Sequence, residues 1–239
     1  LKVSNDSSEI HSLIGMEYLF LDNYEAAKIH FKNCIDLNIE DYSSLYNIIY
    51  CFEFLDQNQE AIDYLNWYLD QNPYCEVAWH QLGKQYLIIK DLNKALTAFD
   101  FAIISDDTFI GAYLEKAKVL ERLNRFKEAI DNYNISMAIE GPTAFTYLKI
   151  GGCHEKMHHK DKALKYFFNS VKEDPAFDKG WIQIAHFYFS KKDDLKALFY
   201  VNKAIDIDDE NVSYWLFYSK TNHRLNYLEE AERGFKKTL

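Results

Sequence analysis

Seven alanines recur at intervals of 34 residues, and this spacing constrains the fold of the chain more than any other feature. The register has no insertion or deletion between its members, which are Ala27, Ala61, Ala95, Ala129, Ala163, Ala197 and Ala231. Self-similarity at a fixed period of roughly 20 to 50 residues is typical of solenoids and other repeat arrays. The spacing therefore predicts a stack of similar supersecondary units.

Two further positions keep the same period. Four residues after each alanine stands a mostly bulky residue, namely Phe31, Leu65, Phe99, Tyr133, Phe167, Val201 and Phe235. Twelve residues before each alanine the side chain is mostly small, namely Gly15, Ile49, Gly83, Ala117, Gly151, Ala185 and Ser219. Residues four apart share one face of a helix. The pattern predicts two helices per repeat that meet at the small residue, with wider spacing where Ile49 replaces it.

Composition supports helices over strands. Only 8 Gly and 3 Pro occur in 239 residues, whereas an all-β chain needs a turn every few residues. Hydrophobic residues make up 48% of the chain, which is enough to build a core. We therefore expect an all-α protein.

The third repeat carries the most complete version of a known pattern. Its residues Trp79, Leu82, Gly83, Tyr86, Ala95 and Phe99 fit W-x2-L-G-x2-Y followed by A-x3-F. In this respect the chain resembles the tetratricopeptide repeat family. The resemblance implies a right-handed superhelical α-solenoid of about seven 34-residue helix-turn-helix repeats in a single domain spanning 1–239. The repeats would be 8–41, 42–75, 76–109, 110–143, 144–177, 178–211 and a partial one at 212–239.

Both ends of the repeat array carry expectations of their own. Asp6 followed by Glu9 predicts a capping box that opens the first helix. After the last alanine the chain reaches Leu239 without a polar capping helix, which solenoids need for solubility. We therefore expect either further chain or packing of this repeat on another molecule, including a second copy.

The resemblance also implies a concave groove lined by the first helix of each repeat, which would bind a polypeptide segment. The positions that face this groove in the family are aromatic or apolar near the N-terminus and basic in the middle. The predicted groove residues are Tyr46, Tyr50, His80, Lys84, Lys118 and Arg122. A basic stripe beside aromatic anchors would suit a partner with acidic and aromatic or apolar segments. The same groove positions include Glu53, Glu121 and Glu155, which reduce its net positive charge. The alternative interpretation is that the lysines are ordinary solvated surface residues.

One specialised groove of this family is improbable here. Its carboxylate-clamp members use Lys and Asn, then Asn, then Lys and Arg in three successive repeats. The matching positions of repeats 1 to 3 are Ser12, Met16, Asn47, Val77 and Gln81. Only Asn47 fits, so we do not expect binding of chaperone tails by that clamp.

A catalytic alternative rests on His154-Glu155-Lys156-Met157-His158, which matches the zinc-hydrolase pattern H-E-x-x-H. On a continuous helix this spacing would place two imidazoles one turn apart around zinc. The repeat register opposes such a site, because it puts His154 at a packing position and His158 in the turn between helices. We therefore expect a non-catalytic interaction scaffold, with an assembly module of a larger protein as the alternative and a zinc-dependent hydrolase as a remote one.

Charge and motifs exclude other classes. The net charge of −10 disfavours binding to nucleic acid. The sequence contains no run of about 18 apolar residues, so we expect no segment that inserts into a membrane. Gly83-Lys84 falls inside a predicted helix and not in a phosphate loop, so we expect no cofactor. The four cysteines lack CxxC spacing and are expected to be free and buried, as suits a reducing, cytoplasmic setting.

Overall fold

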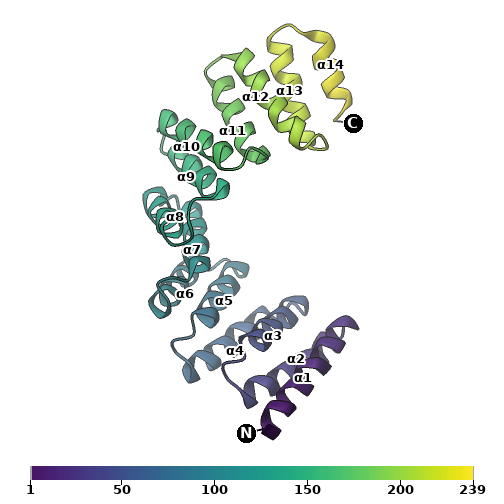
Figure 1. Ribbon diagram of the computed structural model, residues 1–239, viewed down its shortest axis with the longest axis vertical. Coiled ribbons are helices and arrows are strands. Elements are labelled where there is room, and N and C mark those ends of the chain that lie inside the picture. The colour runs from purple at the N-terminus through teal and green to yellow at the C-terminus, as the bar shows by residue number, and fades with distance from the viewer. Residues whose placement is uncertain (1, 239) are drawn as a thin grey trace. The chain divides into compact units, whose positions relative to one another are not determined.

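A computed structural model of the protein describes residues 2–238, and within them the chain forms fourteen α-helices and no strand. Figure 1 shows successive helices joined by short turns. The helices are α1 (Lys2–Phe20), α2 (Tyr24–Leu37), α3 (Tyr42–Phe54), α4 (Asn58–Gln71), α5 (Glu76–Ile88), α6 (Leu92–Ser105), α7 (Ile110–Arg122), α8 (Phe126–Glu140), α9 (Ala144–Lys156), α10 (Lys160–Glu173), α11 (Asp178–Ser190), α12 (Asp194–Ile207), α13 (Val212–Arg224) and α14 (Leu228–Lys236). The predicted all-α helical-repeat fold is confirmed, with one helix pair for each 34-residue repeat.

Every helix pair is joined by a turn with the same backbone conformation. One residue in each turn has a positive φ between 53° and 63°, and none of these residues is glycine. The residues also recur every 34 positions, and they are Asp22, Asp56, Lys90, Asn124, His158, Lys192 and Asn226. The left-handed region is sterically unfavourable for residues that carry a Cβ atom. The repeat geometry therefore holds each of these residues in a conformation that it does not prefer.

The small position of the repeat allows close contact between the two helices. A Cβ atom added to Gly15 would lie 2.8 Å from the ring of Phe31, and one added to Gly83 or Gly151 would lie 2.5 Å from the aromatic ring of its own repeat. These rings belong to the bulky position, and they are almost fully buried. The predicted contact between small and bulky positions is confirmed.

Repeat 2 departs from this contact as predicted. Ile49 fills the small position, and the bulky position holds Leu65 in place of an aromatic ring. Both side chains are buried, but α3 and α4 approach each other along much less of their length than α1 and α2 or α5 and α6 do. The larger Ile49 side chain keeps the two backbones apart.

A hydrogen bond from a large side chain fixes each of several repeats to the turn that precedes it. The indole of Trp79 donates to the carbonyl of Pro73 at 2.8 Å, and the indole of Trp181 donates to that of Pro175 at 2.9 Å. Trp215 makes the equivalent bond to Asp209, six residues earlier, at 2.6 Å. The tryptophan position of these repeats therefore has a polar role as well as a packing role.

Side-chain caps begin several of the helices, and one predicted cap at the N-terminus needs correction. Asn23, Asp41, Asp91 and Asp193 each accept a hydrogen bond from a backbone N–H in the first turn of the following helix. The predicted capping box at Asp6 is wrong, because α1 begins at Lys2 and is already helical at that residue.

The described chain divides into two compact units, with the division after Val119 in α7. The core of the first unit includes Phe31, Leu65 and Tyr68, and the second unit has cores around Phe167 and Val201. The single continuous domain therefore stays a prediction. All four cysteines are free and buried, as predicted.

Candidate functional site

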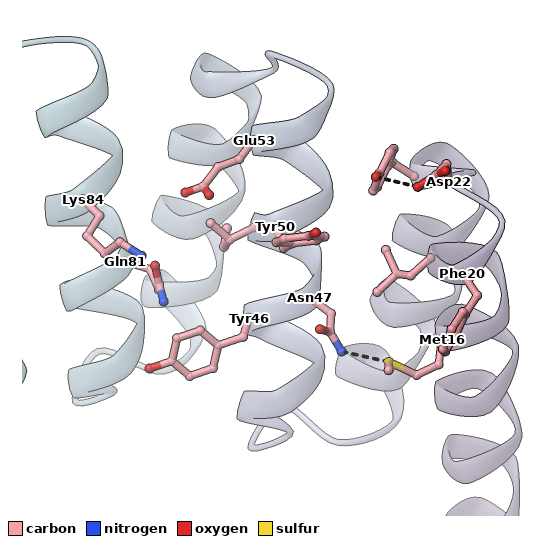
Figure 2. A pocket seen from close by; sticks show the side chains of 12 residues that line it. Met16, Phe20, Asp22, Tyr46, Asn47, Tyr50, Glu53, Gln81 and Lys84 are labelled. Carbon is pink, nitrogen blue, oxygen red and sulfur yellow. Dashed lines mark hydrogen bonds between the residues drawn. The ribbon is translucent and has the colours of Figure 1, made fainter. Parts of the chain in front are cut away.

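The main pocket of the first unit lies on the surface formed by α1, α3 and α5, the first helices of repeats 1 to 3 (Figure 2). Its volume is about 520 Å³. The lining residues are Met16, Leu19, Phe20, Asp22, Tyr24, Tyr46, Asn47, Ile49, Tyr50, Glu53, Gln81 and Lys84. The repeat register brings them together, because neighbouring repeats place equivalent positions side by side.

Aromatic side chains form one side of this pocket. Tyr46 is 41% exposed and Tyr50 is 44% exposed, although both sit among packed helices. The ring of Tyr50 lies 4.6 Å from that of Phe54, which in turn stacks on Tyr24 at 4.6 Å. Phe20, at 84% exposure, continues the aromatic surface on α1. Exposed aromatic side chains that are held rigidly are the usual anchors of protein interfaces.

Two amide side chains occupy equivalent positions in successive repeats beside these rings. Asn47 on α3 donates to the sulfur of Met16 at 3.9 Å (Figure 2). Gln81 on α5 is only 3% exposed, and its Oε1 atom has no hydrogen-bond partner among residues 2–238. Burial raises the pKa of the Tyr46 phenol, and the neighbouring amide of Gln81 partly offsets this effect. An unsatisfied buried acceptor is costly, so the Gln81 amide oxygen would be stabilised by any hydrogen-bond donor that could reach it.

Charges of both signs complete the pocket. Lys84 lines it from α5, one turn beyond the position of Gln81. Glu53 on α3 accepts a hydrogen bond from Nε2 of the fully buried Gln85 at 2.7 Å. Gln85 therefore fixes the direction of the Glu53 carboxylate, a role that sequence reasoning missed because only the packing of α3 against α5 brings the two together.

The structure separates the six predicted groove residues. Tyr46, Tyr50 and Lys84 line the pocket, whereas His80, Lys118 and Arg122 do not. Lys118 pairs with Glu115 on its own helix at 2.7 Å, and Arg122 is exposed at the end of α7 in the second unit. The predicted basic stripe therefore does not line this pocket as a whole, and Lys84 is the one cationic residue among the lining residues.

His80 is partly buried in the first unit, and both of its ring nitrogens are shielded from solvent. Its ring lies between Phe99 and Phe109, at 5.7 and 5.2 Å, and neither ring nitrogen has a hydrogen-bond partner in the described part of the chain. Burial, helped by Lys84, lowers the pKa of His80 to about 4. The imidazole is thus neutral at neutral pH and adds no positive charge to the groove.

The H-E-x-x-H sequence does not form a zinc-site geometry. Helix α9 ends at Lys156, and His158 stands in the following turn with a φ of 62°. The ring of His154 stacks on Tyr166 at 5.3 Å, a packing role that the repeat register predicted. Across residues 2–238 no group of three or more His, Cys, Asp or Glu side chains is placed to hold a metal ion. The two histidines therefore do not face a common metal from one helix.

Helix pairs with a common turn, a small-to-aromatic contact and a lined groove define an α-helical repeat protein. The sequence signature of the tetratricopeptide repeat matches residues 8–38 and 178–211, the first and sixth predicted repeats. The chain therefore carries tetratricopeptide repeats. Among the helices of the described residues, none combines the length and apolar character that crossing a bilayer requires.

Two curated relatives share part of their length with the chain. Anaphase-promoting complex subunit 3 of Schizosaccharomyces pombe is 28% identical over 157 residues, which is 66% of this chain and 24% of that protein. Human tetratricopeptide repeat protein 6 is 24% identical over 198 residues, which is 67% of this chain and 38% of that protein. The chain therefore spans well under half the length of either relative.

Solved structures share the fold at low sequence identity. A tetratricopeptide repeat protein from Parabacteroides merdae has a TM-score of 0.70 at 15% identity, covering 98% of this chain and 92% of that one. The tetratricopeptide repeat protein YrrB, described as having an unusual peptide-binding site, has a TM-score of 0.55 at 16% identity over 73% of this chain and 90% of that one. The anaphase-promoting complex hetero-tetramer Cut9–Hcn1 has a TM-score of 0.62 at 16% identity, covering 100% of this chain and 49% of the matched chain.

Proposed function

We propose that the protein is a non-catalytic scaffold that binds a segment of a partner polypeptide in the groove of α1, α3 and α5. The observation that carries the proposal is the pocket of about 520 Å³ in which exposed Tyr46 and Tyr50 stand beside the unsatisfied amide oxygen of Gln81. The fold relatives support it, since YrrB is described as a protein with a peptide-binding site.

Each part of the pocket would have a distinct role in recognition. The aromatic rings would bury apolar side chains of the segment and provide most of the affinity. Gln81 and Asn47 would bond to the backbone, since one offers a free acceptor and the other a weakly engaged donor. Lys84 would favour an acidic residue of the segment, whereas Glu53 would disfavour a second acidic residue beside it. The preferred segment is thus apolar with a single acidic residue.

Affinity capture with the immobilised chain, followed by mass spectrometry, would identify bound proteins. Ten-residue synthetic peptides covering a captured protein would then be titrated by fluorescence polarisation. We expect Lys84→Glu to weaken binding of the best acidic peptide at least about tenfold, because a charge reversal in a partly enclosed groove replaces attraction with repulsion. A Tyr46→Ala, Tyr50→Ala double variant should abolish measurable binding.

Lys220→Glu is the matched control for Lys84→Glu. Lys220 occupies the same position of its repeat, is exposed and belongs to the second unit. Its reversal should leave the affinity unchanged, and far-UV circular dichroism should be identical for all variants. Equal affinities of the wild type, Lys84→Glu and the double tyrosine variant would refute the groove assignment.

The second candidate is assembly, either with other subunits or with a second copy of the chain. One curated relative is a subunit of the anaphase-promoting complex, and α14 exposes Leu228 by 57% and Phe235 by 40%. Light scattering across a concentration series tests self-association. A dimer that dissociates in Phe235→Glu would support it, whereas a monomer at all concentrations would leave hetero-assembly as the form to test. Phe217 is unsuitable for this test, because it is buried against His186 and Phe189.

A reducing, cytoplasmic location is part of the same proposal. The four thiols are free and buried, and burial raises the pKa of Cys51 to about 11 and that of Cys153 to about 12. Such thiols remain protonated and unreactive, as suits a compartment that keeps cysteines reduced. Fractionation of cells with an antibody against the protein would test the location.

A further inference from the structure

The second unit contains an unexplained glycine in the middle of a helix. Gly151 and Gly152 are adjacent on α9, yet their surroundings are opposite. A Cβ atom added to Gly151 would lie 2.5 Å from the Phe167 ring, whereas one added to Gly152 would meet nothing within 4 Å among the described residues. Glycine in a helix interior is destabilising relative to alanine. Packing explains Gly151, but it does not explain Gly152.

The repeat register shows what is missing at Gly152. The equivalent position of every other repeat carries a side chain, and these are Met16, Tyr50, Lys84, Lys118, His186 and Lys220. Three of them, Met16, Tyr50 and Lys84, line the pocket of the first unit. Gly152 therefore leaves a gap on the surface where the other repeats present a side chain.

That gap is part of a pocket of the second unit with a volume of about 360 Å³. Its residues come from the end of α7 to α11, and those that matter here are Glu121, Leu148, Lys149, Gly152, Glu155 and Lys156. For comparison, a cavity of roughly 150 Å³ accommodates benzene. The pocket that Gly152 lines is thus large enough for a complete aromatic side chain.

The charges around the gap favour a neutral occupant. Two carboxylates, Glu121 and Glu155, face two ammonium groups, Lys149 and Lys156, so the formal charge of this lining is zero. Glu121 is already engaged by Lys149 at 3.5 Å and by the hydroxyl of Tyr133. A lining of zero net charge gives no overall preference for an acidic or a basic side chain. An aromatic ring, in contrast, could pack on the helix surface at Gly152, because Leu148 and Lys156 line the same pocket.

We propose that the Gly152 gap is a binding site for one aromatic side chain of a partner polypeptide. This site would add to the proposed function. It rests on that function in one respect, namely that the second unit also binds a polypeptide. The chain thus presents aromatic rings to its partner in the first unit and receives one in the second. Glycine at position 152 costs the helix stability relative to alanine, but a larger residue would occupy the space that the ring needs.

The test uses the full chain labelled with 15N-glycine, which gives at most eight backbone amide signals for its 8 Gly. The probes are N-acetyl-phenylalaninamide, with N-acetyl-alaninamide and N-acetyl-lysinamide as comparisons. A fragment of this size binds with a Kd on the order of 1 mM at best. We expect the phenylalanine probe to shift the Gly152 signal in a saturable way and the other two probes to leave it unchanged.

Gly152→Met fills the gap with a residue that the same position holds in repeat 1. It should remove the assigned signal, abolish saturable shifts at Gly151 and raise the midpoint of thermal unfolding by about 2–4 °C, since methionine is a better helix former. Lys220→Met places methionine at the same position two repeats later and should leave the Gly152 shift intact. The rise in thermal stability shows that lost binding in Gly152→Met is not caused by unfolding.

Several outcomes would overturn the proposal. They are the absence of a shift at Gly152 up to about ten times the expected Kd, equal shifts with all three probes, and undiminished shifts at Gly151 in Gly152→Met. A phenylalanine shift confined to Gly83 would place the aromatic site in the first unit, which rejects this inference and leaves the proposed function standing. A saturable shift at Gly152 without peptide binding in the Tyr46 pocket would support this inference and reject the proposed function of the first unit.

Discussion

Gly83 and Phe99 are in direct contact across the two helices of repeat 3. A Cβ atom at Gly83 would lie 2.5 Å from Cε1 of the Phe99 ring, and Phe99 has no exposed surface through which the ring could move away. The same relationship holds for Gly15 with Phe31 and for Gly151 with Phe167. The width of the space between the helices is therefore set by the two residues together.

Gly83→Ala should destabilise the protein by about 1–3 kcal/mol, the usual cost of overpacking a core, although alanine favours the helix more than glycine does. Phe99→Leu should restore part of the loss in the double variant, because repeat 2 pairs Ile49 with Leu65. Thermal unfolding followed by circular dichroism measures both effects. A Gly83→Ala protein as stable as the wild type would contradict the contact.

Glycine at the turn positions should stabilise the protein. Lys90 and Lys192 are exposed and have φ values of 63° and 62°. Lys90→Gly and Lys192→Gly remove the Cβ atom that makes this region unfavourable, and each should add about 0.5–1 kcal/mol after the entropy of glycine is deducted. Chemical denaturation would measure the gain.

Asn124→Gly is the matched comparison for the two lysine variants. Asn124 has a φ of 59°, and asparagine tolerates the left-handed region better than lysine does. Its replacement should therefore change stability less than either lysine replacement. A larger gain at Asn124 than at Lys90 would show that steric relief at the turn is not the cause.

His80 should make the stability of the protein fall on acidification. Its pKa is about 4 in the folded state and near the ordinary value of 6.5 when unfolded, so the unfolded chain binds the proton more readily. The contribution to stability is complete above the unfolded pKa and is lost as the pH falls towards 4. Between about pH 8 and about pH 5 the loss from His80 alone should be about 2 kcal/mol.

His80→Leu isolates this effect from that of the carboxylates. The variant keeps an apolar side chain between Phe99 and Phe109 but cannot bind a proton. Its denaturation midpoint should decline less between these two pH values than that of the wild type. Parallel curves for the two proteins would show that His80 is not the group responsible.

Tyr214→Phe should weaken the connection between repeats 6 and 7. The Tyr214 hydroxyl donates to a carboxylate oxygen of Asp178 at 2.5 Å, and both burial and this bond raise the pKa of the phenol. Removing the donor leaves the carboxylate without this bond, at a cost of about 1–3 kcal/mol. Tyr200→Phe provides the comparison, because the Tyr200 ring contributes by stacking on Trp181 and Tyr188 and should lose much less.

Much of the fold follows from periodicity, because one register assigns every residue to an equivalent position. The spacing of Ala27 and its counterparts predicted the helix pairs, the glycine contacts and the placement of His158 in a turn. The site was predicted less well. His80 occupies a groove position by spacing, but it is partly buried because Phe109, the last residue of the same repeat, packs against it. A repeat pattern identifies which way a position faces and does not show how neighbouring side chains fill the space.

The partners in the small-to-bulky contact both lie within one 34-residue unit, sixteen residues apart. A unit that is copied therefore carries its own matched pair, whether glycine with phenylalanine or isoleucine with leucine. Arrays built in this way can gain or lose whole units without creating a clash inside any of them. A change to one member of a pair has to be compensated within the same repeat, so each repeat can diverge independently of its neighbours at this contact.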